Sequence, residues 1–218
     1  MEALVGKKCV VIVGGGVAGS LLAKNLQNFA DVHLIDAKEY FEIAWAGMRC
    51  IVEPSFAERS VIKHSEYAPN ATIICSAAVG VTENEVTTED GHRTAYDYLV
   101  IATGHNDTTP ATKQEKLSNY QSEQEKIKAA NSILIVGGGP SGVELAGEIT
   151  TDFPGKKVTL VHRGSRLLEF IGEKAGKKAL DWLTAKNVEV ILGQSVDLNS
   201  CTDGSWLLSN IRGRVCRS

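Results

Sequence analysis

The chain has 218 residues, which is enough for one large domain or two compact ones. Hydrophobic residues make up 43% and charged residues 22%, as in folded globular proteins and unlike collagen-like or disordered chains. The formal net charge of −3 provides no basic excess to hold a nucleic-acid backbone. Nucleic acid is therefore not expected as a partner.

The five cysteines occur singly, so we expect neither a metal site nor a disulfide scaffold. A reducing compartment fits this pattern, and we expect a cytoplasmic rather than a secreted protein. The uncharged stretch 9–23 imitates a secretory signal, but its three central glycines favour a strand that leads into a turn. No run approaches 18 apolar residues, so we expect no membrane span, and only peripheral membrane contact stays open.

An internal repeat organises the chain. The apolar run 10–13 and the glycines 14–16 recur as residues 133–136 and 137–139, at an offset of 123 residues (14 to 137). Each copy predicts a short strand, a glycine turn and a helix.

The remaining pattern alternates between helix and strand. Residues 39–66 give no clear period, an Asp-Gly pair at 90–91 predicts a hairpin, and the polar stretch 106–119 marks a domain boundary. We expect helices at about 18–28, 122–130, 141–151 and 173–186, strands at 32–36, 158–162 and 188–192, and β structure within 72–103.

The first glycine motif has the spacing of a dinucleotide-binding turn. Gly14 makes the tight turn, Gly16 lets the backbone approach a pyrophosphate, and Gly19 lets the helix pack on the strand. Asp36 follows 22 residues after Gly14, where a carboxylate can accept hydrogen bonds from ribose hydroxyls. Together these features predict a dinucleotide site.

The second motif, Gly137-x-Gly139-x-x-Gly142, is followed by a strand that ends in His162-Arg163 instead of an acid. Arg163 can pair with a 2′-phosphate, so the site tolerates or prefers NADPH, although Arg163 fits equally well as a solvent-facing loop residue. Glu144, expected in the first turn of the second helix, either faces the nicotinamide side or merely complements the helix dipole.

Two dinucleotide folds in one chain imply two dinucleotides, most simply a flavin that accepts hydride from a nicotinamide. The first motif with Asp36, the run 96–104 and the second glycine motif resemble, in that order, the pyridine nucleotide-disulfide oxidoreductase superfamily. Residues 40–49 and 142–146 look like its apoptosis-inducing-factor-like branch, which includes ferroptosis-suppressor-type quinone reductases. The resemblance covers about residues 8–205.

The resemblance implies an FAD-dependent oxidoreductase that passes hydride from NAD(P)H to FAD and on to a small-molecule acceptor such as a quinone. No catalytic side chain is expected, because the flavin supplies the chemistry. The resemblance implies that FAD is held by Gly14, Gly16, Val17, Ala18, Gly19, Asp36, Arg49, Val79, Ala102, Thr103 and Gly104. In the same way it implies that NAD(P)H is held by Gly137, Gly139, Pro140, Ser141, Gly142, Glu144, His162 and Arg163.

The sequence also departs from this family. Cys50 has no second cysteine four residues away, so thiol–disulfide chemistry is not expected and Cys50 is interpreted as an ordinary buried thiol. Family members carry a Gly-Asp motif that holds the ribityl chain, and the 218 residues contain no Gly-Asp dipeptide. We therefore expect a C-terminally truncated chain, with a nucleotide-binding module or regulatory isoform without turnover as the alternative. A DNA-binding death effector is disfavoured by the net charge.

The expected fold is α/β, with two Rossmann-like FAD/NAD(P)-binding domains of three ββα layers, the second incomplete. The expected boundaries are 1–118 for the FAD-binding domain, 119–204 for the NAD(P)-binding domain and 205–218 for an irregular tail. The oligomeric state cannot be read from the sequence.

Overall fold

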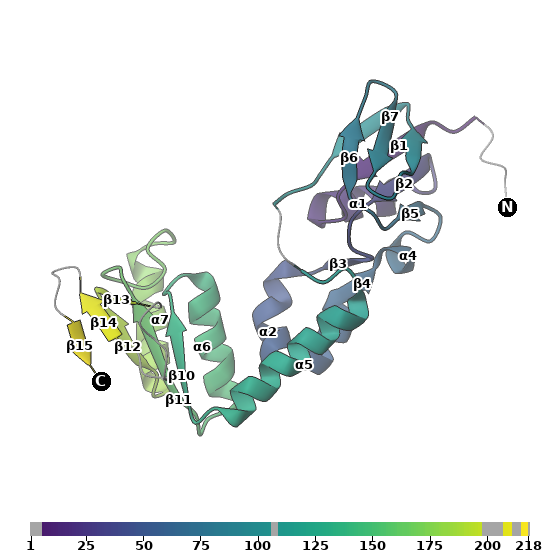
Figure 1. Cartoon of the computed structure of the whole chain (residues 1–218). Coiled ribbons are helices and arrows are strands. Elements are labelled where there is room, and N and C mark those ends of the chain that lie inside the picture. Colours follow the sequence, from purple (N-terminus) through teal and green to yellow (C-terminus); the bar gives the residue numbers. More distant parts are fainter. Residues whose placement is uncertain (1–5, 106–108, 198–206, 211–214, 218) are drawn as a thin grey trace. The chain divides into compact units, whose positions relative to one another are not determined.

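The computed structural model describes residues 6–105, 109–197, 207–210 and 215–217 (Figure 1). The chain divides into two compact units, one comprising Met1–Gly47 and Pro54–Gln121, the other Met48–Glu53 and Ser122–Ser218. The division after Gln121 lies close to the expected boundary, but it falls inside helix α5 (Lys113–Ala129) and not in a linker.

The first unit is built on a four-stranded parallel sheet in the order β5-β2-β1-β9. Its strands are β1 (Cys9–Val13), β2 (Asp31–Ile35), β5 (Thr72–Ile74) and β9 (Tyr98–Ile101). The first three residues of β9 pair with Val10, Val11 and Ile12 of β1, so the two strands end side by side.

Alternate residues of β1 face two different layers. Val10 and Ile12 share a core with Ala23 of α1 (Val17–Leu26) and Ala68, the residue after α4 (His64–Tyr67). Val11 and Val13 share the opposite core with Val86. That second layer is the antiparallel sheet of β6 (Ala78–Val81), β7 (Glu85–Thr88) and β8 (Arg93–Ala95). The expected three ββα layers are therefore present in this unit.

The segment that the sequence left unassigned forms short elements. They are β3 (Tyr40–Glu42), η1 (Ala44–Ala46), α2 (Gly47–Val52), α3 (Pro54–Ser60) and β4 (Val61–Lys63), with β3 and β4 antiparallel. Tyr40 is fully buried, its hydroxyl donates to the carbonyl of Pro110 at 2.8 Å, and burial raises its pKa to about 12. This bond attaches the chain before α5 to the first unit.

The second unit contains the parallel sheet β10-β11-β12. Its elements are β10 (Ser132–Val136), α6 (Pro140–Asp152), β11 (Lys157–His162), α7 (Glu173–Ala185) and β12 (Glu189–Leu192). Ile135, Leu160, Ile149 and Leu183 form one core between the sheet and both helices. The second repeat thus folds as a second strand–turn–helix–strand unit.

The prediction of an irregular tail is wrong for the part of 205–218 that the structure describes. β13 (Gln194–Val196), β14 (Leu207–Asn210) and β15 (Val215–Arg217) form an antiparallel sheet in which Leu208 pairs with Val196 and Cys216. The remaining residues of that tail lie outside the described ranges. Among the described residues, no helix has the length and apolarity needed to cross a membrane.

Candidate functional site

The first glycine turn joins β1 to α1 and has the backbone that its spacing predicts. Gly14 has a φ of +101°, which L side chains rarely adopt. Its N–H donates to the carbonyl of Ile35 at 2.7 Å, and a Cβ added to it would lie 2.9 Å from the Cα of Thr103. Glycine here lets the turn close against the chain that follows β9.

The other two glycines of this motif have different roles. A Cβ on Gly19 would overlap the carbonyl oxygen of Gly14, so Gly19 allows the helix to pack on the turn. Gly16 caps α1 with an ordinary φ of −72°, and a Cβ on it would meet nothing within 4 Å. Val17 and Ala18 are exposed beside it. Because the first N–H groups of a helix have no intrahelical acceptor, this open end is suited to a pyrophosphate.

Asp36 lies directly below this turn, as the motif predicts. Its side chain is buried, and its Oδ2 accepts a hydrogen bond from the N–H of Gly15. Its Oδ1 accepts from the backbone N–H of Lys38 at 2.7 Å and from the Lys38 ammonium at 3.2 Å. The carboxylate therefore shapes the turn itself, and its position at the end of β2 matches that of a ribose-binding acid.

His64 supports the turn from below, and no sequence motif reveals it. The residue is fully buried, with Nε2 3.0 Å from the carbonyl oxygen of Lys38 and Nδ1 2.7 Å from the hydroxyl of Tyr67. Since a carbonyl only accepts, Nε2 carries the proton and Nδ1 accepts from Tyr67. Burial lowers the pKa of His64, so the ring is neutral. A Cβ on Gly15 would lie 2.7 Å from Nε2, which explains a glycine at this position too.

Four more of the residues expected at FAD lie in two places of the first unit. Ala102, Thr103 and Gly104 follow β9, where the N–H of Ala102 donates to Val13 at 2.8 Å and Gly104 has a φ of +62°. Val79 is 64% exposed on β6. The structure thus brings the residues after β9 to the first turn, and it leaves Val79 accessible on the neighbouring layer.

Arg49 belongs to the second unit, and its partners were not expected. Its guanidinium is 3.0 Å from Asp152, 2.7 Å from Glu148 and 2.5 Å from Glu53. These carboxylates raise its pKa, and the Arg49–Glu148 and Arg49–Asp152 pairs join α2 to α6. Its expected approach to a cofactor stays a prediction, and the contacts observed for it are structural.

The second glycine turn repeats the first. Gly137 has a φ of +121°, and its N–H donates to the carbonyl of Val161 at 2.8 Å. Gly139 caps α6 with open space where a Cβ would lie, and a Cβ on Gly142 would overlap the carbonyl oxygen of Gly137. Pro140 and Ser141, at the exposed start of α6, complete a helix end like that of α1.

His162 takes the place of Asp36 in this second turn. Val136 pairs with Val161, as Val13 pairs with Ile35, so His162 is the register counterpart of Asp36. A Cβ on Gly138 would lie 2.7 Å from the ring of His162 and 2.6 Å from the side chain of Leu167. The exposed Arg163 follows directly.

A groove of about 250 Å³ opens at this turn. It is lined by the consecutive glycines 137–139, by the ends of β10 and β11 with His162 and Arg163, and by β13. From β13, Gln194 contributes a side-chain oxygen that is buried and has no hydrogen-bond partner among the described residues. Buried polar atoms are normally paired, so this unpaired oxygen distinguishes Gln194 among the residues that line the groove. Gln194 was missed in the sequence, where no motif marks it.

Glu144 is not where the sequence placed it. It is the fifth residue of α6, and the first turn of that helix contains no acid, so the proposed helix-dipole role does not apply. Partial burial and the neighbouring Glu148 carboxylate raise the pKa of Glu144. Its side chain is exposed and is not among those lining the groove.

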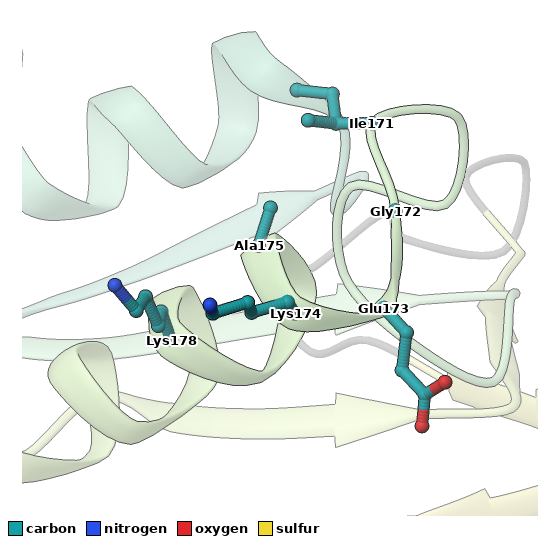
Figure 2. A pocket seen from close by; sticks show the side chains of 6 residues that line it. All are labelled: Ile171, Gly172, Glu173, Lys174, Ala175 and Lys178. Atoms are coloured by element: carbon teal, nitrogen blue, oxygen red, sulfur yellow. The ribbon is translucent and has the colours of Figure 1, made fainter.

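A second hollow of about 420 Å³ lies at the start of α7 (Figure 2). Its lining comes from Ile171 to Ala175 and from Lys178, and it includes none of the residues expected to bind a nucleotide. The groove at the second glycine turn is therefore the hollow that coincides with the predicted site.

With this geometry established, comparison with known proteins assigns the family. Residues 8–209 match the pyridine nucleotide-disulphide oxidoreductase family. The chain belongs to this family. It is 35% identical over 206 residues to apoptosis-inducing factor homolog A of Dictyostelium discoideum, covering 88% of this chain and 50% of that protein. It is 34% identical over 197 residues to ferroptosis suppressor protein 1 of Xenopus tropicalis, covering 86% of this chain and 52% of that protein. The chain thus spans about half the length of these relatives.

Solved structures share the fold. Sulfide:quinone oxidoreductase of Aquifex aeolicus superposes with a TM-score of 0.70 at 22% identity, over 97% of this chain and 56% of that one. NDH2 of Plasmodium falciparum in complex with NADH superposes with a TM-score of 0.68 at 17% sequence identity. The match covers 97% of this chain and 53% of that one. An engineered water-forming NADPH oxidase, derived from the Lactobacillus brevis NADH oxidase, superposes with a TM-score of 0.67 at 18% sequence identity. The match covers 96% of this chain and 52% of that one. At these identities the likeness concerns the fold alone.

Proposed function

We propose that this chain binds FAD at the first glycine turn and NAD(P)H at the second, as part of an FAD-dependent NAD(P)H oxidoreductase whose acceptor is a quinone. The observation that carries the proposal is that two glycine turns have the same backbone but contact different side chains, an acid at the first turn and a histidine with an arginine at the second. One closes on the buried carboxylate of Asp36, the other on His162 and the exposed Arg163.

The first turn fits FAD on two counts. The space in front of Gly16 is open, while Gly14 and Gly19 leave no room for a Cβ, as expected if one glycine serves the ligand and two serve the fold. The N–H groups at Val17 and Ala18 would hold the pyrophosphate, and Asp36 would accept from the ribose. Ala102 to Gly104 would pass beneath the cofactor, where small residues permit close approach.

The second turn fits a nicotinamide nucleotide with a 2′-phosphate. β11 ends in His162 and is followed directly by Arg163, which lines the groove, whereas an acid follows β2. The engineered NADPH oxidase differs from its parent at five positions, two of which change an adjacent Asp-Ala pair to Ala-Arg. In this chain the first turn likewise has an Asp-Ala pair, Asp36-Ala37, and at the second turn His162-Arg163 stands in its place. The acid is again absent and an arginine present. This parallel supports NADPH over NADH.

When bound, FAD would take hydride from NAD(P)H and pass the electrons to the acceptor. The residues of this chain would bind and orient the two nucleotides, and no side chain is required as an acid or base. A quinone acceptor is supported by the shared fold with a sulfide:quinone oxidoreductase. A nucleotide-binding module without turnover would use the same two turns.

The proposal is tested by incubating the purified chain with FAD, removing free FAD by gel filtration and recording the visible spectrum. We expect a flavin band that co-elutes with the protein and that NADPH bleaches under anaerobic conditions. A chain that elutes without flavin at saturating FAD would contradict the first half of the proposal. Retained flavin that neither NADPH nor NADH bleaches, with no binding of either nucleotide, would contradict the second.

A further inference from the structure

A cluster of three metal-ligand side chains lies at the end of β1 and β2 opposite to the first glycine turn. Cys9 begins β1, Asp31 begins β2, and His33 follows two residues later on the same face of the strand. The parallel register pairs Cys9 directly with Asp31. Three different ligand types thus meet at the start of two neighbouring strands.

The ligand atoms are close enough to share one ion. One atom each of Cys9, Asp31 and His33 lie within 4.8 Å of one another, and His33 Nε2 is 3.4 Å from Asp31 Oδ2. In a tetrahedral zinc site with the usual bond lengths, ligand atoms are separated by about 3.3–3.7 Å. Small side-chain rotations therefore suffice to close the cluster around an ion, and the partial exposure of all three residues provides an entry path.

The protein contacts of the ligand atoms are weak. The thiol of Cys9 donates to the carbonyl of Ala95 at 3.2 Å, and a thiol is a weak hydrogen-bond donor. The Nε2 of His33 faces Asp31 Oδ2 at 3.4 Å. An ion therefore displaces little when it binds to these three side chains.

We propose that Cys9, Asp31 and His33 bind one zinc ion, with water in the fourth position. A thiolate, a carboxylate and a neutral imidazole together balance the charge of Zn²⁺. Sulfur and nitrogen ligands favour zinc over the hard cations magnesium and calcium, which prefer oxygen. Binding exchanges the thiol proton for the metal: the S–H bond breaks, a Zn–S bond forms and H⁺ leaves to solvent.

The surrounding charges favour a cation. Asp31 is itself a ligand, and Asp97 accepts a hydrogen bond from the N–H of Cys9 and pairs with Lys8 at 2.8 Å. These two carboxylates place negative charge at this end of the strands, which attracts a divalent cation.

The ion would link the starts of β1 and β2 beside β8, and it would lie far from the proposed nucleotide site. The five residues of β1 separate Cys9 from Gly14, which corresponds to about 16 Å at the usual rise per strand residue. Zinc and FAD should therefore bind independently. A failed zinc experiment would therefore not contradict the proposed FAD site, and a failed FAD experiment would not contradict the proposed zinc site.

The first experiment uses Co²⁺ as a spectroscopic probe on the full chain. We expect a thiolate-to-cobalt charge-transfer band with tetrahedral d–d bands, both removed by Zn²⁺. Cys9→Ser should abolish the charge-transfer band, and Asp31→Asn or His33→Gln should weaken Co²⁺ binding at least 10-fold. Cys75→Ser and His92→Gln are matched controls in the same unit and should leave the spectrum unchanged. A charge-transfer band that survives Cys9→Ser, or none in the parent chain, would overturn the proposal.

The second experiment needs no variant, so it also holds if a substitution prevents folding. The native chain is alkylated with iodoacetamide with and without saturating Zn²⁺, and each cysteine is followed by mass spectrometry. We expect Zn²⁺ to slow alkylation of Cys9 at least 10-fold and to leave the exposed Cys75 unaffected. An unchanged rate at Cys9, or equal protection of both thiols, would show that zinc does not bind here.

Discussion

The two glycine turns share a backbone and differ in what lies beneath it. In both, the first glycine has a positive φ, the third admits no Cβ, and the capping glycine faces open space. Below the first turn lie Asp36 and the neutral His64, and below the second lie His162 and Leu167. The comparison teaches that the glycine spacing determines the backbone of the turn, whereas the side chain beneath the turn differs. On the proposed function, that side chain and its neighbour select the nucleotide.

The largest expected effect concerns the rate of NADPH oxidation, which requires both glycine turns to hold their nucleotides at once. Hydride transfer requires reacting atoms within about 3–3.5 Å, and on the proposed function the first turn would hold only the adenosine and pyrophosphate end of FAD. With no Gly-Asp dipeptide to hold the ribityl chain, we expect NADPH oxidation by this chain, FAD and a soluble quinone to be at least ~10³-fold slower than the usual enzyme range of ~1–10³ s⁻¹. The rate is measured against FAD and quinone without protein. A rate inside that range would show that the chain positions the flavin ring unaided.

Substitution of each capping glycine should remove one nucleotide and leave the other bound. Gly16→Val fills the space that the pyrophosphate needs, so FAD retention should be lost, while the free energy of unfolding changes by about 1 kcal/mol or less because the Cβ meets no neighbour. Flavin fluorescence titration and thermal unfolding provide the two readouts. Gly139→Val, the control, should lose NADPH and keep FAD. If each variant loses both nucleotides, the turns are not separate sites.

Arg163 tests the chemical difference directly. A charge-assisted contact to the 2′-phosphate contributes about 1.5–3 kcal/mol, so Arg163→Ala should weaken NADPH binding by roughly 10- to 150-fold and leave NADH nearly unchanged. Arg166→Ala is a matched control, because Arg166 lies in the same loop and donates to the carbonyl of Glu169. Equal loss of NADH and NADPH, or no loss, would remove Arg163 from 2′-phosphate recognition.

His64 gives the first turn a pH dependence. Burial lowers its pKa below the unfolded value of about 6.5, so the unfolded chain binds the extra proton first. Stability from this group is fully present above pH ~6.5 and falls as the pH drops below it, by at most about 1.4 kcal/mol per pH unit. Denaturant unfolding of the parent and of His64→Gln between pH 5 and 8, a range of roughly three units around that pKa, measures the difference. Parallel curves would show that His64 is not held neutral.

The turns were predictable from sequence because their constraints are local. The expected helix at 18–28 is observed as Val17–Leu26, the strand at 32–36 as Asp31–Ile35, and Gly14, Gly19 and Asp36 take the expected places. Spacing alone determines such contacts, since a strand, a tight turn and a helix follow one another in the chain.

The rest depends on contacts between distant residues. His64 comes 28 positions after Asp36, and it reaches the turn only once β3, β4 and α4 have folded. The carboxylates around Arg49 include Glu148, which is 99 residues away. Glu144 falls just beyond the first turn because the helix begins at Pro140, one residue before the expected start. Gln194 joins the groove through a strand with no motif. Lone polar residues of this kind carry no periodic signal.

The central claim is that one chain holds two separate nucleotide sites of different selectivity. The most direct test is equilibrium dialysis of the chain with FAD and with 2′,5′-ADP, a fragment that carries the phosphate of NADPH but no nicotinamide. We predict one molecule of each bound per chain, with the affinity for 2′,5′-ADP unchanged when FAD is saturating. Displacement of 2′,5′-ADP by FAD, or a total of one nucleotide per chain, would contradict the claim.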